Sequence, residues 1–124
     1  MSIALNADPA AGPFARPLSD SDRHIGVAMH LTPLLAFLFG PAILAPLVLW
    51  LVRKDDSSFV DDHGREMINA IISFVIYHIV AFITVIGIIA LPVLYIIGVV
   101  SLVRGAVAAG RGDLFRYPMT MRFL

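Results

Sequence analysis

Two long apolar runs, separated by a charged segment, dominate the pattern of the chain. Residues 24–52 and 67–103 contain no Asp, Glu, Lys or Arg, whereas residues 53–66 are rich in charge. As single helices the two runs would be about 44 Å and about 56 Å long, which exceeds the hydrocarbon core of a bilayer, about 30 Å. Each run therefore predicts two helices folded into a hairpin within a membrane.

Local signals divide the first run. Ser19 and Asp22 have the spacing of a capping box, so a helix is expected to begin near Asp20 and to end near Phe39. Gly40–Pro41 predicts the turn, because Pro is favoured at a first helical position. A shorter second helix is then expected to end near Lys54.

The second run begins in a charged helix start. Ser58 and Asp61 repeat the Ser-x-x-Asp spacing of a cap. Gly87 and Pro92 bracket the expected turn, and the last helix is predicted from about Pro92 to Gly110. The fold class expected is an all-α polytopic membrane protein of four helices arranged as two hairpins.

Two hairpins would place all nine Lys and Arg residues on one side of the membrane, as the positive-inside bias prefers. The alternative has three spans, with a first helix kinked at Pro33 and the N-terminus outside. It would expose Arg16 and Arg23. The hairpin interpretation predicts a multi-pass protein of the bacterial inner membrane with cytoplasmic termini.

Composition sets the domain organisation and excludes some chemistry. Hydrophobic residues make up 59% of the chain, Cys is absent, and the net charge of zero gives no sign of nucleic-acid binding. Residues 1–18 lack the pattern of a cleavable signal peptide and, with their prolines, predict a disordered tail. Residues 19–112 form the expected helical membrane domain, and residues 113–124 a cytoplasmic or interfacial tail.

Polar residues occupy one side of the predicted third helix at about 100° per residue. They are Asp62, His63, Glu66, Asn69, Ser73, Tyr77 and Thr84. We call the last four, which lie in the uncharged run, the polar stripe. One interpretation is hydrogen bonding to other helices, with His30, Thr32 and the carbonyl freed by Pro33 as partners. The other is a polar path for ions or polypeptide.

The charged residues at the start of the predicted third helix are candidate metal ligands. Asp61, Asp62, His63 and Glu66 include pairs that share a helix face. Carboxylates that complement the helix dipole explain the same pattern, and no second set of ligands completes a site, so no metal is expected. A further use is an ion-paired contact between the acidic segment and tail arginines such as Arg116.

A ridge of small residues marks the last helix. Gly98, Ser101, Gly105 and Ala109 allow close helix packing, either within the bundle or in a homodimer. The chain contains none of the metalloprotease, serine-hydrolase or P-loop motifs. No enzyme activity, catalytic residue or cofactor is therefore expected.

Two motifs carry a family resemblance. The first is His63-Gly64-Arg65-Glu66 followed by Asn69, and the second is Tyr117-Pro118-x-Thr-x-Arg122-Phe123. With these motifs the chain resembles small bacterial membrane proteins grouped as a domain of unknown function. It is more distantly similar to the twenty-kilodalton subunit of the chloroplast inner-envelope Tic import complex. The resemblance implies four membrane helices with both ends in the cytoplasm, and marks these motif residues as candidates for interaction.

The functional prediction is a structural or accessory membrane subunit that binds a partner through its cytoplasmic loop and tail. Expected partners are the lipid bilayer and either a second copy or another membrane protein. The alternative is a component of a protein-translocation or transport pathway in which Asn69, Ser73 and Tyr77 face a polar path.

Overall fold

The computed structural model describes residues 8–10 and 17–124, and there the chain consists of helices and an extended tail. The prediction of disorder over residues 1–18 therefore falls mostly outside the described ranges. The helices follow one another as α2 (Asp20–Leu31), η1 (Thr32–Phe37), η2 (Gly40–Leu44), α3 (Ala45–Arg53), α4 (Ser58–Ile83) and α5 (Val85–Arg111). The predicted all-α class is confirmed.

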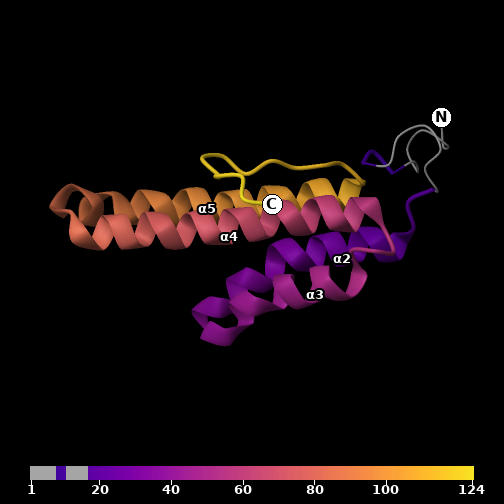
Figure 1. Cartoon of the computed structure of the whole chain (residues 1–124), viewed down its shortest axis with the longest axis horizontal. Coiled ribbons are helices and arrows are strands. Elements are labelled where there is room, and N and C mark those ends of the chain that lie inside the picture. The colour runs from indigo at the N-terminus through magenta and orange to yellow at the C-terminus, as the bar shows by residue number, and fades with distance from the viewer. Residues whose placement is uncertain (1–7, 11–16) are drawn as a thin grey trace.

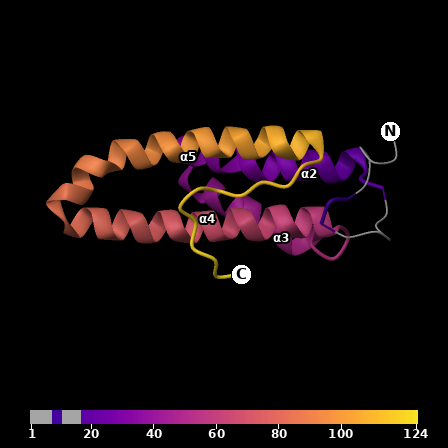
Figure 2. The same cartoon turned by 90° about the horizontal axis from the view of Figure 1, so that it is seen from above.

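Helices α4 and α5 form a long antiparallel pair, and the shorter hairpin of α2 and α3 packs against one half of it (Figures 1 and 2). Both long helices are apolar enough and, at about 40 Å, long enough to cross a membrane. Their far half exposes large apolar side chains such as Phe82, Ile83 and Ile86. Helix α2, with 12 residues, is about 18 Å long and does not cross a bilayer as an α-helix.

The first hairpin follows the predicted breaks but changes helix type. The capping box at Ser19 is present, and α2 begins at Asp20 as predicted. The expected continuous helix to Phe39 is wrong, because the α-helix ends at Leu31 and continues as the 3₁₀ helix η1. Pro33 stands in the first turn of η1, where its missing N–H breaks no α-helical hydrogen bond.

The expected turn between Gly87 and Pro92 is also wrong. The chain turns at Thr84, whose backbone is extended (φ −128°, ψ 138°) and whose Oγ1 accepts a hydrogen bond from Gly87 N at 3.1 Å. Thr84 thus caps α5, which continues through Pro92 to Arg111. Pro92 leaves one carbonyl of α5 without its usual donor. A longer turn over residues 87–92 would leave several backbone groups unpaired in an apolar setting.

The start of α4 also differs from the prediction by one residue. Ser57, not Ser58, is the N-cap, and its Oγ accepts from Val60 N at 3.3 Å. Ser58 instead donates its hydroxyl to Asp8 Oδ2 at 2.6 Å, and the same oxygen accepts from Phe59 N at 3.0 Å. The helix start therefore has two capping side chains, one of them distant in sequence.

The small-residue ridge of α5 packs within the chain. A Cβ at Gly105 would lie 2.4 Å from His30 Nδ1, and one at Gly26 would lie 3.0 Å from Ala109 Cβ. A Cβ at Gly98 would lie 3.4 Å from the ring of Phe74 on α4. These contacts bring α2 and α5 close together and support the first of the two interpretations of the ridge.

Candidate interaction site at the polar end

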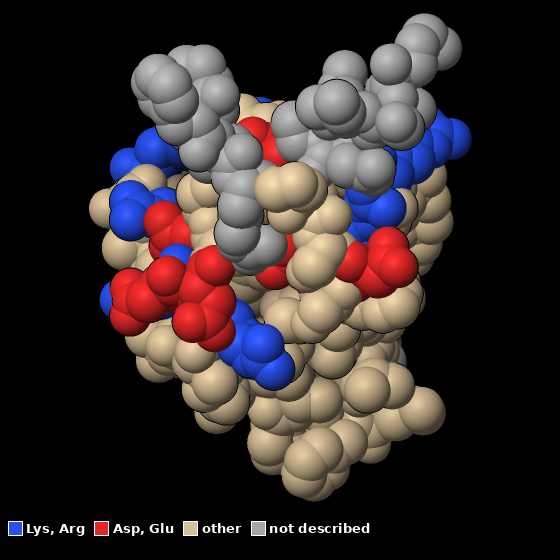
Figure 3. Space-filling model, turned by 90° about the vertical axis from the view of Figure 1, so that its right-hand side faces the viewer, with Lys and Arg blue, Asp and Glu red and all other residues tan. Residues whose placement is uncertain are grey.

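We call the charged end of the α4–α5 pair the polar end. There the start of α2 and the segment between α3 and α4 meet the beginning of the tail of residues 113–124, which then runs back along the long helices toward their middle (Figure 1). Figure 3 looks onto this end and shows acidic and basic side chains gathered on it. The hydrogen bonds that build the site lie beneath them, in the contacts between α4 and the tail.

Asn69 and Ser73 of the polar stripe bind the backbone of the tail. Asn69 Oδ1 accepts from Phe123 N at 3.0 Å and from Leu124 N at 2.9 Å. Ser73 Oγ accepts from Met121 N at 2.8 Å. Because an extended segment has no internal partners for its N–H groups, these two buried side chains supply what a neighbouring strand would otherwise supply.

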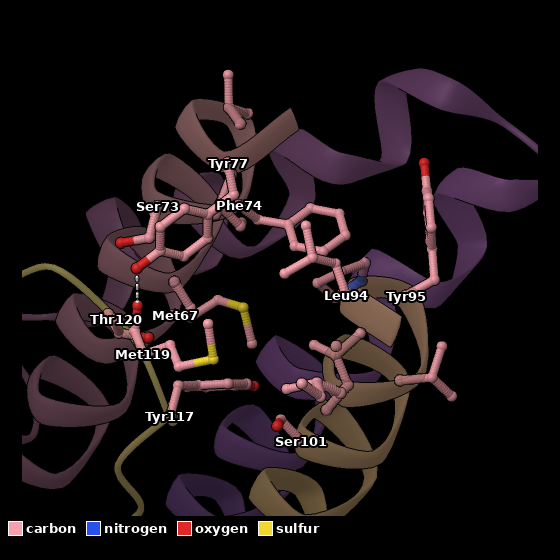
Figure 4. A pocket seen from close by; sticks show the side chains of 18 of the residues that line it. Met67, Ser73, Phe74, Tyr77, Leu94, Tyr95, Ser101, Tyr117, Met119 and Thr120 are labelled. Atoms are coloured by element: carbon pink, nitrogen blue, oxygen red, sulfur yellow. Dashed lines mark hydrogen bonds between the residues drawn. The ribbon is translucent and has the colours of Figure 1, made fainter. Parts of the chain in front are cut away.

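Tyr77 marks the point where the tail reverses. Its hydroxyl donates to the Met119 carbonyl (Figure 4). Met119 has a φ of 59°, in the left-handed region that a non-glycine residue rarely adopts. The tail thus runs along α4 as far as Tyr77, turns at Pro118–Met119, and returns toward Asn69.

Glu66 joins the tail at two points. The side chain is only 4% exposed, yet its carboxylate accepts from Tyr117 N at 2.5 Å and from the Arg122 guanidinium. A buried carboxylate needs such partners, because an unpaired charge out of water is costly. The two motifs that carry the family resemblance, around Glu66 and around Arg122, therefore meet in one ion pair.

Behind Glu66 lies a directed chain of hydrogen bonds through two fully buried histidines. His63 Nε2 lies 2.8 Å from the Asp113 carbonyl, which only accepts, so this nitrogen carries the proton. His63 Nδ1 must then accept from His30 Nε2, at 2.8 Å. His30 Nδ1 in turn accepts from the Tyr117 hydroxyl. The contacts fix the tautomer of both neutral rings.

Burial keeps the groups of this hydrogen-bond network uncharged. Burial first, and the Glu66 charge second, raise the pKa of Tyr117 above its usual value. Since the chain ends on a peptide carbonyl, which cannot pass a proton onward, its geometry suits fixing the tail rather than transferring protons.

Ion pairs cover this network from outside. Arg116 donates to both carboxylate oxygens of Asp62, at 2.7 and 2.8 Å. Asp61 accepts from Trp50 Nε1 at 2.8 Å and from Arg65 Nε at 3.0 Å. These half-exposed pairs contribute only about 0–1 kcal/mol each. The Arg116–Asp62 pair brings the tail onto the acidic segment, as the charge pattern predicts.

The structure brings most of the predicted site residues together. His30, His63, Glu66, Asn69, Ser73, Tyr77, Tyr117 and Arg122 form one connected contact region with the tail. Gly64 instead makes room for Trp50, and a Cβ there would lie 2.2 Å from the indole Cδ1. Arg65 is exposed, and Thr84 lies at the opposite end of α4.

The partners predicted for the polar stripe were wrong. The stripe does not bind the first hairpin: its first three residues bind the tail, and Thr84 caps α5. His30 binds His63, and Thr32 Oγ1 is buried without a hydrogen-bond partner. The sequence analysis missed the Asp113 carbonyl and the backbone of Met119 and Met121. A backbone group has no signal in the sequence, so no pattern could have identified it.

The metal hypothesis for the start of α4 has no geometric support. Asp62 faces Arg116, His63 faces His30, and Glu66 faces the tail. Among residues 8–10 and 17–124, no group of three or more His, Asp or Glu side chains is arranged to hold a metal ion.

Comparisons with known proteins give one finding. The model of the magnetosome magnetite crystal formation protein family (MamF/MmsF) matches residues 21–124. No curated protein and no solved structure matches the chain. The similarity to the chloroplast translocon subunit therefore stays a prediction.

Proposed function

The chain belongs to the magnetosome magnetite crystal formation protein family, and from that premise we propose that it is a small integral membrane protein of the magnetosome. In this proposal it serves magnetite crystal formation as a structural or accessory subunit. It acts by binding a partner through its polar end. Both hairpins lie in the membrane, with all charges on one side.

The family match is the observation that carries the proposal. It extends over residues 21–124, so it includes the charged segment between α3 and α4 as well as the tail. These two segments are far apart in sequence, and Glu66–Arg122 and Asp62–Arg116 join them. The polar end is thus one surface, built by the region that the family shares.

The chemistry of this surface supports contact with a charged partner. It exposes side chains of both signs, namely Arg53, Asp55, Asp56, Arg65 and Arg111. The hydrogen bonds to α4 hold the tail in one conformation, which lowers the entropy that a partner must remove on binding. Another membrane protein or a layer of lipid headgroups fits such a surface.

Crystal measurements in a magnetite-forming bacterium that carries this chain test the cellular role. Deletion of the chain is expected to change the size or shape distribution of magnetite crystals seen by electron microscopy, and the full chain is expected to restore it. A Glu66→Ala variant that is present in the membrane at the normal level should fail to restore it. Unchanged crystals after deletion would contradict the proposal.

Photocrosslinking tests the surface itself. A photoreactive residue in place of Asp55 should capture a reproducible partner in these membranes. The same residue in place of Leu38, which is 89% exposed at the tip of the first hairpin, should not capture it. Equal capture from both positions would remove the polar end as the binding surface.

The second candidate function, a component of a translocation or transport pathway, makes a different demand. A polar path along Asn69, Ser73 and Tyr77 would require the tail to leave the stripe, because these side chains bond to it. Cysteine at position 73 or 77 should then react with a membrane-impermeant thiol reagent in the active state. Protection under all conditions would exclude this function.

A further inference from the structure

A cavity lies between α4 and α5, next to the polar end, where the uncharged parts of the two helices begin. Its volume is about 350 Å³, within the range of small-molecule pockets and more than twice that of cavities that hold benzene. Figure 4 shows side chains from both helices, such as Phe74 and Leu94, converging on it, with Tyr117 and Met119 of the tail along one side. The first hairpin closes the other side with Pro33, Ala36 and Ile43.

The cavity begins where the charges of the long helices end. Its lining on α4 starts at Met67, the residue after Glu66, and its lining on α5 ends at Leu102, two residues before Arg104. The lining is overwhelmingly apolar, which disfavours water as the occupant. Val75 and Val99 of the lining are also exposed on the outer surface, so the cavity borders the lipid-facing side of the pair.

Arg104 supplies a positive charge at the rim. It lies about one helical turn from Ser101, a lining residue, on the side of the polar end. Its guanidinium is exposed and stands 5.9 Å from the centre of the Phe115 ring. Within the described ranges no carboxylate pairs with it. The arginine is therefore available to an anionic group at the level where lipid headgroups lie.

We propose that this cavity binds one acyl chain of an anionic phospholipid whose phosphate contacts Arg104. An acyl chain matches the apolar lining, and the lining begins within about one helical turn of Arg104, so a phosphate at Arg104 leaves the chain next to the cavity. Tyr117 and Met119 contact the lipid from the tail, so a bound lipid also supports the tail in its place on α4. The inference rests on the membrane setting of the proposed function, but not on the role in crystal formation.

The test uses the full chain in phosphatidylcholine vesicles that contain phosphatidylglycerol with a photoreactive group in one acyl chain. Crosslinks are expected on cavity residues such as Ile71, Phe74 and Leu94, well above those on the exposed Ile79 and Ile96. Native mass spectrometry should find one phosphatidylglycerol retained per chain. Crosslinks spread evenly over the cavity residues and the exposed faces would overturn the proposal.

Two pairs of variants separate the acyl-chain site from the headgroup site. Ala70→Phe fills the cavity and should abolish lipid retention, whereas Val80→Phe on the outer face of α4 should leave it unchanged. Arg104→Gln should lower the preference for phosphatidylglycerol over phosphatidylcholine about five-fold, the contribution of one arginine near anionic lipid. Arg111→Gln, two turns further along α5, should change it less.

The outcomes remain informative if one variant fails. If Ala70→Phe does not fold, the crosslink map of the unaltered chain still decides where the acyl chain lies. An equal preference for both lipids in the unaltered chain would overturn the role of Arg104. Every lipid measurement uses purified protein. A negative lipid result therefore does not contradict the role in magnetite formation, and a negative magnetite result does not contradict lipid binding.

Discussion

Asn69 binds two successive amides of the tail, accepting from Phe123 N at 3.0 Å and Leu124 N at 2.9 Å. One carbonyl oxygen of a buried side chain thus fixes the far segment of the tail against α4. Together with Glu66 and Ser73, it turns a row of polar side chains on a membrane helix into a binding site for an extended peptide within the same chain.

The first prediction concerns this contact. Asn69→Ala should free the tail and lower the free energy of unfolding by about 1–3 kcal/mol, because two amides lose their acceptor. Trypsin should then cut after Arg116 and Arg122 several-fold faster in membranes. Thr120→Ala, in the same tail but without a hydrogen bond from its side chain to α4, serves as the control. Equal cleavage rates in the two variants would contradict the contact.

The second prediction tests the hydrogen bond between the Tyr117 hydroxyl and His30. Tyr117→Phe removes the hydroxyl that donates to His30 Nδ1 and leaves this buried nitrogen unpaired, at a cost of about 1–3 kcal/mol. Tyr77→Phe removes a hydroxyl that bonds to the tail in a more exposed setting, and should cost less. Thermal unfolding in detergent compares the stability of the two variants. An equal loss of stability, or a larger loss in Tyr77→Phe, would be evidence against the hydrogen bond from Tyr117 to His30.

The third prediction concerns helix contact. Gly105→Ala would place a Cβ 2.4 Å from His30 Nδ1, so α2 and α5 must separate or the ring must move. We expect a loss of about 1–3 kcal/mol in stability. Gly110→Ala on the same helix meets only Val27 at 3.5 Å and should be neutral or slightly stabilising. A neutral Gly105→Ala would mean that the two helices are not packed as described.

Elements that depend on local chemistry could be predicted from the sequence. The Ser19 capping box, the break at Gly40–Pro41 and the two long apolar helices follow from spacing and composition. The turn at Thr84 could not be placed, because Gly87 and Pro92 give stronger local signals. The decisive features, a threonine hydroxyl that caps α5 and the cost of opening the backbone in an apolar layer, depend on context.

The site divides in the same way. The polar side of α4 could be predicted because helical periodicity places its residues on one face. Its occupant could not, because the tail contributes backbone amides and carbonyls that every residue carries. The contact of His30 with His63 depends on the close approach of α2 to α5 at Gly105, a tertiary feature with no short-range signal.

A disulfide between α4 and the tail tests whether the tail lies along this helix. The chain has no Cys, so Ser73→Cys combined with Met121→Cys gives a pair without background. Ser73 Oγ lies 2.8 Å from Met121 N, and mild oxidation of intact membranes is predicted to join the pair rapidly. An Ile79→Cys and Met121→Cys pair should not react. If neither pair forms a bond, or both do equally, the tail does not occupy the stripe.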